Sequence, residues 1–271
     1  GRPCAATMFG GRSSSSFTRD VISRALEERP GRRGSRALRF AVAAEVPRFA
    51  REVSRGGLVV DRLAFTPVGS GTEVLREVNL RIPPTGLNLI VGRSGFGKST
   101  LLHLITGLSE PTGGCITFTD QPDFGHMSSA ERLARVGLVF QFPERHFLGT
   151  DMLSELTFGW PQKPEAFPKR RALALKLQDA LQAVGMSNFP LDTPVASLSG
   201  GYKRRLALAI QLVRDPYVLC LDEPLAGLDW RARSEVVTLL ADLRKERAIV
   251  VVSHDVEEIS PVTDRAFRMG K

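Results

Sequence analysis

The sequence has little of several features that mark particular protein classes. Its 271 residues include three cysteines, an odd number without paired spacing, so neither a disulfide framework nor a cysteine-based zinc site is indicated. Uninterrupted apolar runs, such as FAVAA at 40–44 and AIVVV at 248–252, reach only five residues. A membrane-spanning helix needs about 20 apolar residues. The sequence therefore predicts that this chain does not cross a membrane alone.

An excess of positive charge is also missing from most of the chain. Residues 1–56 hold 12 arginines, no lysine and five acidic residues, a net charge of +7, which leaves +1 for residues 57–271. Binding of nucleic acid needs a basic surface on the folded body. The nearly neutral body therefore argues against a nucleic-acid partner.

The leading segment has the composition of a targeting sequence. It has no acidic residue before Asp20, four consecutive serines, and arginine as its one basic residue type. This composition is typical of an organelle transit peptide. We therefore interpret residues 1–56 as a transit segment that is largely disordered. A disordered tail without an address function is the alternative.

A phosphate-binding motif follows two segments that alternate like β-strands, LVVDRLAF and VLREVNLRI. The apolar segment GLNLIV at 86–91 leads directly into GRSGFGKST at 92–100, and the helical pattern LLHLITGL comes next. A strand, the pattern G-x-x-x-x-G-K-[ST] and a helix form the P-loop arrangement. The sequence thus predicts a nucleotide site here, against the alternative of a glycine-rich turn before an ordinary helix.

The residue types of this loop suit a triphosphate. Glycines open backbone conformations that other residues avoid, so consecutive N–H groups can form a nest for an anion. The helix behind them adds its positive N-terminal end. Lys98 would reach the β- and γ-phosphates, and the Ser99 hydroxyl would ligate Mg²⁺. The predicted nucleotide-binding residues of the loop are Gly92, Arg93, Ser94, Gly95, Phe96, Gly97, Lys98, Ser99 and Thr100.

A second motif, VLCLDE at 218–223, is an apolar strand that ends in two carboxylates and precedes Pro224. Asp222 is placed to hold Mg²⁺ through water, and Glu223 is placed to polarise an attacking water. An acidic residue that only closes a core strand is the alternative. The pair of carboxylates favours the catalytic interpretation.

A third motif, LSGGY at 198–202, places a serine and two glycines before a helix. By itself it would be a turn with an N-cap, or an open set of amides for an anion. Together with the P-loop and VLCLDE, it resembles the ATPase subunits of ATP-binding cassette (ABC) systems over residues 57–271. The resemblance extends to Gln141 in VFQFPE as the Q-loop glutamine, Asp229 in LAGLD as the D-loop aspartate, and His254 in VVSHD as the switch histidine.

The resemblance implies a nucleotide site shared by two chains. ATP and Mg²⁺ would be the cofactors, a second ABC ATPase subunit (identical or related) would be one partner, and a separate transmembrane subunit would be the other. The signature residues that complete the site in trans would be Ser199, Gly200, Gly201 and Tyr202. The implied Mg²⁺ ligands are Ser99, Gln141 and Asp222. The implied catalytic residues are Glu223, His254 and Lys98.

Two positions depart from the family pattern. Tyr202 stands where many cassettes have glutamine, and Pro67 stands where the resemblance implies an aromatic that stacks on adenine, with Phe65 two residues earlier. The residue that stacks on adenine is therefore left open.

The predicted fold is α/β, a P-loop nucleoside triphosphatase core with a parallel sheet. The VLCLDE and AIVVV segments supply further strands of that sheet. Helical patterns at 169–185 and 202–213 indicate a helical subdomain inserted at about 141–212. The folded ABC ATPase domain is assigned to residues 57–271.

FQFPERHF at 140–147 and SELTFGWP at 154–161 indicate the subfamily. They resemble the energy-coupling-factor and cobalt-type importer ATPases, and resemble still more the non-intrinsic ABC proteins of plastids. The resemblance implies transport of a metal ion or small cofactor at an organelle membrane, with a chloroplast favoured over a mitochondrion. The nearby aromatics would form a docking patch or belong to the core; they are Phe142, Phe147, Phe158 and Trp160. A soluble assembly ATPase, like the cassette of the iron–sulfur scaffold machinery, is the alternative function.

Overall fold

The computed structural model describes residues 56–120 and 127–270. The predicted transit segment, residues 1–56, lies outside the described residues except for Gly56. The described chain forms two sheets, a three-stranded antiparallel sheet in the order β2-β1-β4 and a five-stranded parallel sheet in the order β5-β6-β7-β3-β8. The strands are β1 (Leu58–Phe65), β2 (Leu75–Ile82), β3 (Gly86–Val91), β4 (Gly113–Phe118), β5 (Val136–Val139), β6 (Val218–Asp222), β7 (Ala248–Val252) and β8 (Arg265–Arg268).

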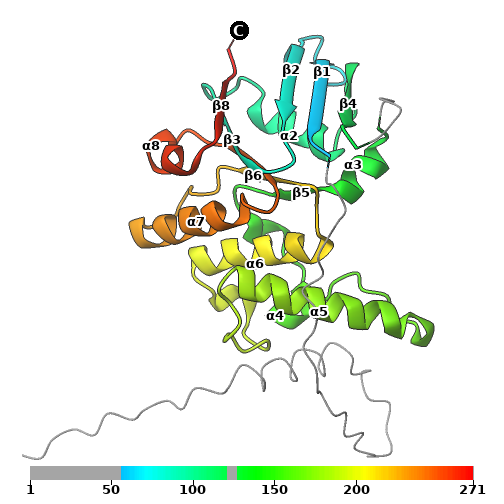
Figure 1. Ribbon diagram of the computed structural model, residues 1–271, viewed down its shortest axis with the longest axis vertical. Coiled ribbons are helices and arrows are strands. Elements are labelled where there is room, and N and C mark those ends of the chain that lie inside the picture. The colour runs from blue at the N-terminus through cyan, green and yellow to red at the C-terminus, as the bar shows by residue number, and fades with distance from the viewer. Residues whose placement is uncertain (1–55, 121–126, 271) are drawn as a thin grey trace, which may run out of the picture.

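Helices lie between and below the sheets (Figure 1). They are α2 (Lys98–Thr106), α3 (Ser129–Arg135), α4 (Met152–Leu156), α5 (Phe167–Ala183), α6 (Gly200–Arg214), α7 (Trp230–Leu243) and α8 (Val256–Ile259). The antiparallel sheet is at the top of the view, and α4 and α5 form the bottom layer. The α/β class with a parallel sheet is therefore confirmed.

Four of the parallel strands, β3, β5, β6 and β7, are buried on both faces, whereas the edge strand β8 is largely exposed, and the buried side chains divide between two cores. In β6, Leu219 and Leu221 pack with residues of α6, whereas Val218 and Cys220 pack with residues of α2. Because successive side chains of a strand point to opposite faces, α2 and α6 lie on opposite sides of this sheet. Burial on both faces explains why these strands read as continuous apolar runs.

The segment between β5 and β6 is helical. It holds α4, α5 and α6, with short 3-10 turns and a single β-bridge between Asp151 and Pro194. The helices α5 and α6 share the same core as one face of the parallel sheet. The helical content agrees with the predicted insertion, while the boundary at about 141–212 stays a prediction.

A charge pair beneath the antiparallel sheet gives a pH-dependent contribution to stability. The side chain of Arg132 in α3 is fully buried, and its Nη2 lies 2.7 Å from Glu110 Oε2. The Ser129 hydroxyl and the Arg132 guanidinium lower the pKa of Glu110 to about 2. A carboxyl whose pKa is lowered by folding stabilises the fold above its unfolded pKa and loses that contribution as the pH falls.

We expect Glu110→Gln to lower the free energy of unfolding near pH 7. Its deficit relative to the parent should shrink between pH 5 and pH 3, because Glu110 becomes protonated in the unfolded parent first. The effect will be modest since half of the Glu110 side chain is exposed. Urea unfolding of both proteins across this pH range measures it. A deficit that stays constant with pH would contradict the assignment.

Candidate active site

The carboxyl ends of four neighbouring parallel strands bring the predicted motifs to one edge of the sheet. The P-loop follows β3, Asp222 ends β6, His254 follows β7, and Gln141 follows β5. The pairing of β3 with β7, β7 with β6 and β6 with β5 is parallel throughout. Ligands of open α/β sheets bind at this edge.

The P-loop is a turn that requires glycine and leaves a helix N-terminus open. Gly95 and Gly97 have φ values of 83° and 82°, in the region that favours glycine. A Cβ on Gly97 would lie 2.7 Å from Leu75 Cδ2 in the neighbouring sheet. No side chain caps α2, and its first turn has no acidic residue. The amides at the start of α2 are therefore suited to an anion.

Lys98 is held inside this loop. Its side chain is buried, and its Nζ donates to the carbonyls of Gly92 (2.9 Å) and Arg93 (3.1 Å). A lysine ammonium has three donors, so these two bonds place the charge within the loop and leave one donor. The cation is thus positioned before any phosphate arrives.

Asp222 and Ser99 form the oxygen-rich part of the site. Burial raises the pKa of the Asp222 carboxyl, and the negative charge of Glu223 acts in the same direction. The Ser99 hydroxyl lies near Asp222 and acts to lower the pKa of that carboxyl, as do the charges of His103 and Lys98. A nearby cation would counter the rise in pKa, because an opposite charge favours the ionised carboxylate.

Glu223 is held by three contacts to one oxygen. Its Oε2 accepts hydrogen bonds from the Ser253 hydroxyl (3.1 Å) and the His254 backbone N–H (3.2 Å), and it lies 2.9 Å from His254 Nδ1. Glu223 raises the pKa of the His254 imidazole. The backbone φ of Glu223 is 45°, a strained value for a residue with a side chain, and such strain clusters at functional sites.

The signature residues begin α6. Ser199 is the N-cap, and its hydroxyl accepts from the Tyr202 N–H at 3.4 Å. A Cβ on Gly200 would lie 3.3 Å from Leu228, and one on Gly201 would lie 3.1 Å from the Cβ of Ala232. The glycines thus permit a close approach of α6 to the D-loop segment and α7. The ring of Tyr202 packs against the ring of Phe189, with centroids 4.5 Å apart.

Two further predicted residues have local partners. Asp229 is the N-cap of α7, where its Oδ1 accepts the Ala232 N–H at 2.9 Å. Gln141 is half-buried after β5, and its backbone carbonyl accepts a bond of 2.6 Å from Arg204. The functional roles of both side chains stay predictions.

Sequence comparison assigns this arrangement to a family, because the profile of the ABC transporter family matches residues 75–226. The chain belongs to this family. This ABC chain is 46% identical over 210 residues to "ABC transporter I family member 11, chloroplastic" of Arabidopsis thaliana, with 76% of each chain covered. It is 33% identical to the energy-coupling factor transporter ATP-binding protein EcfA2 of Acetivibrio thermocellus, over 73% of this chain and 70% of the relative.

Solved structures of the family share its fold. The structure of cbiO1 from Clostridium perfringens, part of the ABC transporter complex cbiONQ, matches with a TM-score of 0.67 and 31% identity, over 78% of this chain and 84% of that one. A bacterial Atm1-family ABC exporter with ATP bound matches with a TM-score of 0.64 and 25% identity, over 84% of this chain and 41% of that one. The predicted P-loop fold and the predicted ATPase activity are confirmed at the level of the family.

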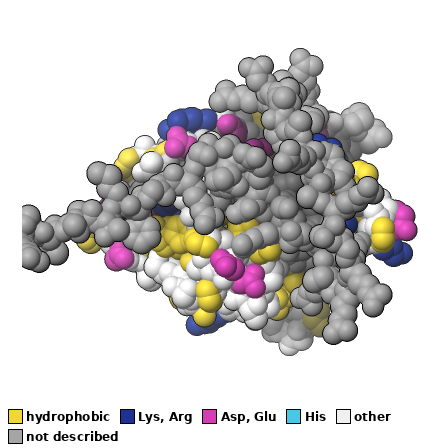
Figure 2. All heavy atoms as spheres, turned by 90° about the horizontal axis from the view of Figure 1, so that it is seen from below, with side chains coloured by type: hydrophobic (Ala, Val, Ile, Leu, Met, Phe, Trp, Pro, Cys, Tyr) yellow, Lys and Arg dark blue, Asp and Glu magenta, His cyan; other side chains and the backbone are white. Residues whose placement is uncertain are grey.

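The four aromatic residues that the sequence suggested as a docking patch differ in their exposure. Phe158 is 64% exposed, Trp160 is buried in the core, and Phe142 and Phe147 are half-buried. Leu148 is also exposed. Figure 2, seen from the side of α4 and α5, shows hydrophobic side chains at the surface beside acidic ones. No helix within residues 56–120 and 127–270 is long and apolar enough to cross a membrane.

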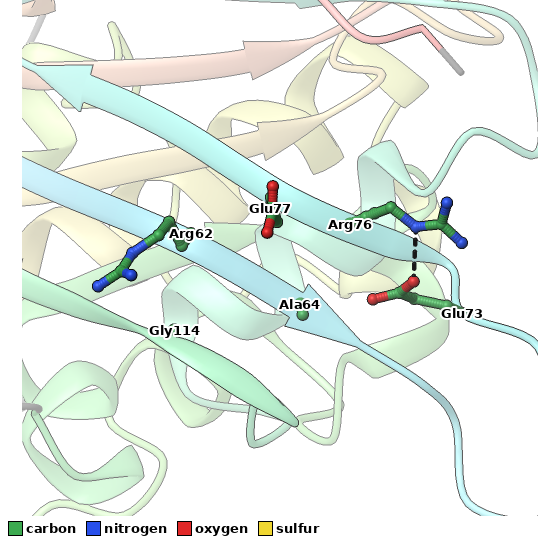
Figure 3. A pocket seen from close by; sticks show the side chains of 6 residues that line it. All are labelled: Arg62, Ala64, Glu73, Arg76, Glu77 and Gly114. Atoms are coloured by element: carbon green, nitrogen blue, oxygen red, sulfur yellow. Dashed lines mark hydrogen bonds and ion pairs between the residues drawn. The ribbon is translucent and has the colours of Figure 1, made fainter.

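A hollow of about 670 Å³ lies elsewhere, on the antiparallel sheet. Figure 3 shows Arg62 and Glu77 on β1 and β2, with Arg76 paired to Glu73 at the start of β2. Its lining includes none of the predicted site residues. Its exposed charges of both signs single out no ligand.

Sequence reasoning missed two polar side chains that contact the site. Ser253 is fully buried beside Glu223, and its place immediately before His254 was the available signal. Arg204 is buried, as are Ala207 and Leu208. The three residues lie on one face of α6, since residues three and four apart on a helix are neighbours. A charge within that apolar face was the signal for Arg204.

Proposed function

We propose that this ABC ATPase binds ATP between two cassettes. One observation carries the proposal: the P-loop helix α2 and the signature helix α6 pack on opposite faces of the parallel sheet. Ser199 and the amides after it therefore begin a helix on the other side of the sheet from the helix that follows the P-loop of their own chain. Both helix N-termini suit an anion. A second chain, identical or related, brings its Ser199, Gly200 and Gly201 to the γ-phosphate.

The residues at the sheet edge supply the chemistry of hydrolysis. Glu223 takes the proton of the attacking water as general base. Lys98 neutralises negative charge on the β- and γ-phosphates. His254 Nδ1 is 2.9 Å from Glu223 Oε2, so it orients that carboxylate. The family resemblance implies that His254 also contacts the γ-phosphate. Loss of the γ-phosphate removes the anion that joins the chains, which lets them separate.

The site also suits Mg²⁺. Ser99 and Asp222 offer adjacent oxygen donors, and Gln141 would add an amide oxygen. Mg²⁺ prefers oxygen ligands and is commonly bound by one or two protein groups together with substrate phosphates. When bound, the ion neutralises charge that develops on the phosphates.

The transport role rests on the relatives and on the surface. The Arabidopsis relative is described as chloroplastic, EcfA2 as a transporter ATP-binding protein, and cbiO1 as part of a transporter complex. The exposed Leu148 and Phe158 lie beside the Q-loop segment and α4, where they offer apolar contacts to a partner. A separate membrane subunit therefore couples this ATPase, at a chloroplast membrane, to uptake of a metal ion or small cofactor.

Affinity purification from detergent-solubilised chloroplast membranes tests this role. We expect a polytopic membrane protein to be recovered with the tagged chain, and Phe158→Asp to reduce its recovery. Leu108→Asp is the matched control, since Leu108 is also exposed but follows α2. Recovery of soluble scaffold proteins in place of a membrane protein would support an assembly ATPase instead. Equal recovery with both variants would contradict the docking surface.

A further inference from the structure

A buried arginine joins three segments around the nucleotide edge. Arg204 lies in α6, with 3% of its surface exposed. Its Nη1 donates to the carbonyls of Phe140 (2.8 Å) and Gln141 (2.6 Å), and its Nη2 donates to the carbonyl of Ala226 (3.2 Å). Phe140 and Gln141 begin the Q-loop segment, and Ala226 belongs to LAGLD. One guanidinium therefore joins the signature helix, which carries it, to the Q-loop and the D-loop.

Burial of the Arg204 guanidinium costs free energy unless its N–H donors are paired. Burial lowers the pKa of Arg204, while Glu144 opposes that shift. Both terminal nitrogens have carbonyl partners, and Nε has none among the described atoms. Losing the side chain would leave half-buried carbonyls in two loops without their donor, which costs more than losing an exposed bond.

The position of Arg204 along α6 links it to the signature serine. Ser199 caps the helix, and Gly200 approaches Leu228 of the D-loop segment in the first turn. Arg204 binds Ala226 about one turn later. Two successive turns of α6 thus contact the D-loop, and the second also contacts the Q-loop. Because a helix is rigid over this length, a shift of either loop that keeps its hydrogen bond to Arg204 would also move Ser199.

We propose that Arg204 is a positioning residue that holds the Q-loop and D-loop in a fixed relation to the signature serine. This rests on the proposed function, in which Gln141 belongs to the site of its own chain and Ser199 to the site of the partner. The guanidinium then transmits the state of one site to the other. A lysine cannot replace it fully, since a point charge does not offer the planar set of donors of a guanidinium.

Arg204→Met tests the proposal, with Arg205→Met as the matched control. Arg205 is on the same helix and makes a comparable pair of bonds, to the Val184 carbonyl (3.2 Å) and to Glu235 (2.6 Å), but contacts neither loop. We expect Arg204→Met to lower kcat about tenfold, the loss of roughly one charge-assisted hydrogen bond. The KM for ATP should stay within about twofold, because Lys98 and the P-loop are unchanged. Arg204→Lys should recover part of kcat.

Amide hydrogen exchange gives a second readout that needs no ATP. Exchange within residues 140–144 and 224–229 should accelerate together in Arg204→Met and stay at the parental rate in Arg205→Met. Equal kcat and equal exchange in the two variants would overturn the role of Arg204. A parental chain that fails to hydrolyse ATP or to pair would refute the proposed function instead, and the exchange result would still decide whether Arg204 joins the loops.

Discussion

Lys98→Ala should lower kcat/KM for ATP hydrolysis by about 10²–10³-fold or more. The Lys98 ammonium is held within the loop by the carbonyls of Gly92 and Arg93, and removing one preorganised electrostatic donor from an active site costs this much. ATP binding should weaken as well, because the charge that faces the phosphates is lost in the ground state too. Binding of a fluorescent ATP analogue and phosphate release measure the two effects.

The fold should survive this change. The two hydrogen bonds of Lys98 contribute about 1 kcal/mol each to the free energy of unfolding, which is small beside the apolar core. Lys245→Ala is a matched control, because Lys245 lies at the surface in the turn after α7 and pairs with Asp242 of that helix. It should bind and hydrolyse ATP like the parent. Parental activity in Lys98→Ala would show that the P-loop assignment is wrong.

Glu223→Gln should separate ATP binding from hydrolysis. A glutamine keeps an oxygen that can accept from Ser253 and the His254 N–H, so the local structure is preserved. It cannot take a proton from water, and loss of a general base costs about 10²–10⁴-fold. We therefore expect kcat to fall by about that factor while ATP stays bound. Single-turnover hydrolysis and retention of radiolabelled ATP on a desalting column measure these outcomes.

Glu110→Gln is the matched control, because it makes the same replacement of a glutamate by glutamine away from the nucleotide edge. It should hydrolyse ATP at the parental rate, since Glu110 pairs with Ser129 and Arg132 near α3. Hydrolysis by Glu223→Gln at the parental rate would exclude Glu223 as the general base and leave the P-loop assignment intact.

The nucleotide edge could be predicted from the sequence because its chemistry lies in side-chain identity and spacing. The glycines around Lys98 and the paired carboxylates after an apolar strand can be recognised directly in the sequence. Their convergence follows from the parallel sheet, whose strands all end at one edge. The exposed Phe158 and buried Trp160 could not be separated, because two aromatics two residues apart give no periodic signal.

The contacts of Arg204 were beyond sequence reasoning for a different reason. Its acceptors are backbone carbonyls, which every residue has, and they come from segments about 20 and 60 residues away. The bulge in β1 could not be predicted from the sequence either. Arg62 has a φ of 44°, and the pairing register with β2 shifts between Val60 and Leu63. A bulge adds a residue to one strand, and only the neighbouring strand determines where that residue fits.

Association of the Glu223→Gln protein tests most directly whether ATP is bound between two chains. Sedimentation velocity should show a monomer without nucleotide and a dimer with ATP and Mg²⁺. The emission of Trp230, which is 79% exposed beside the D-loop, should shift to the blue as it is buried. Adding Ser199→Asp should prevent both changes, because aspartate keeps the N-cap but repels the triphosphate. A protein that stays monomeric with ATP bound, or a dimer indifferent to Ser199→Asp, would contradict the account.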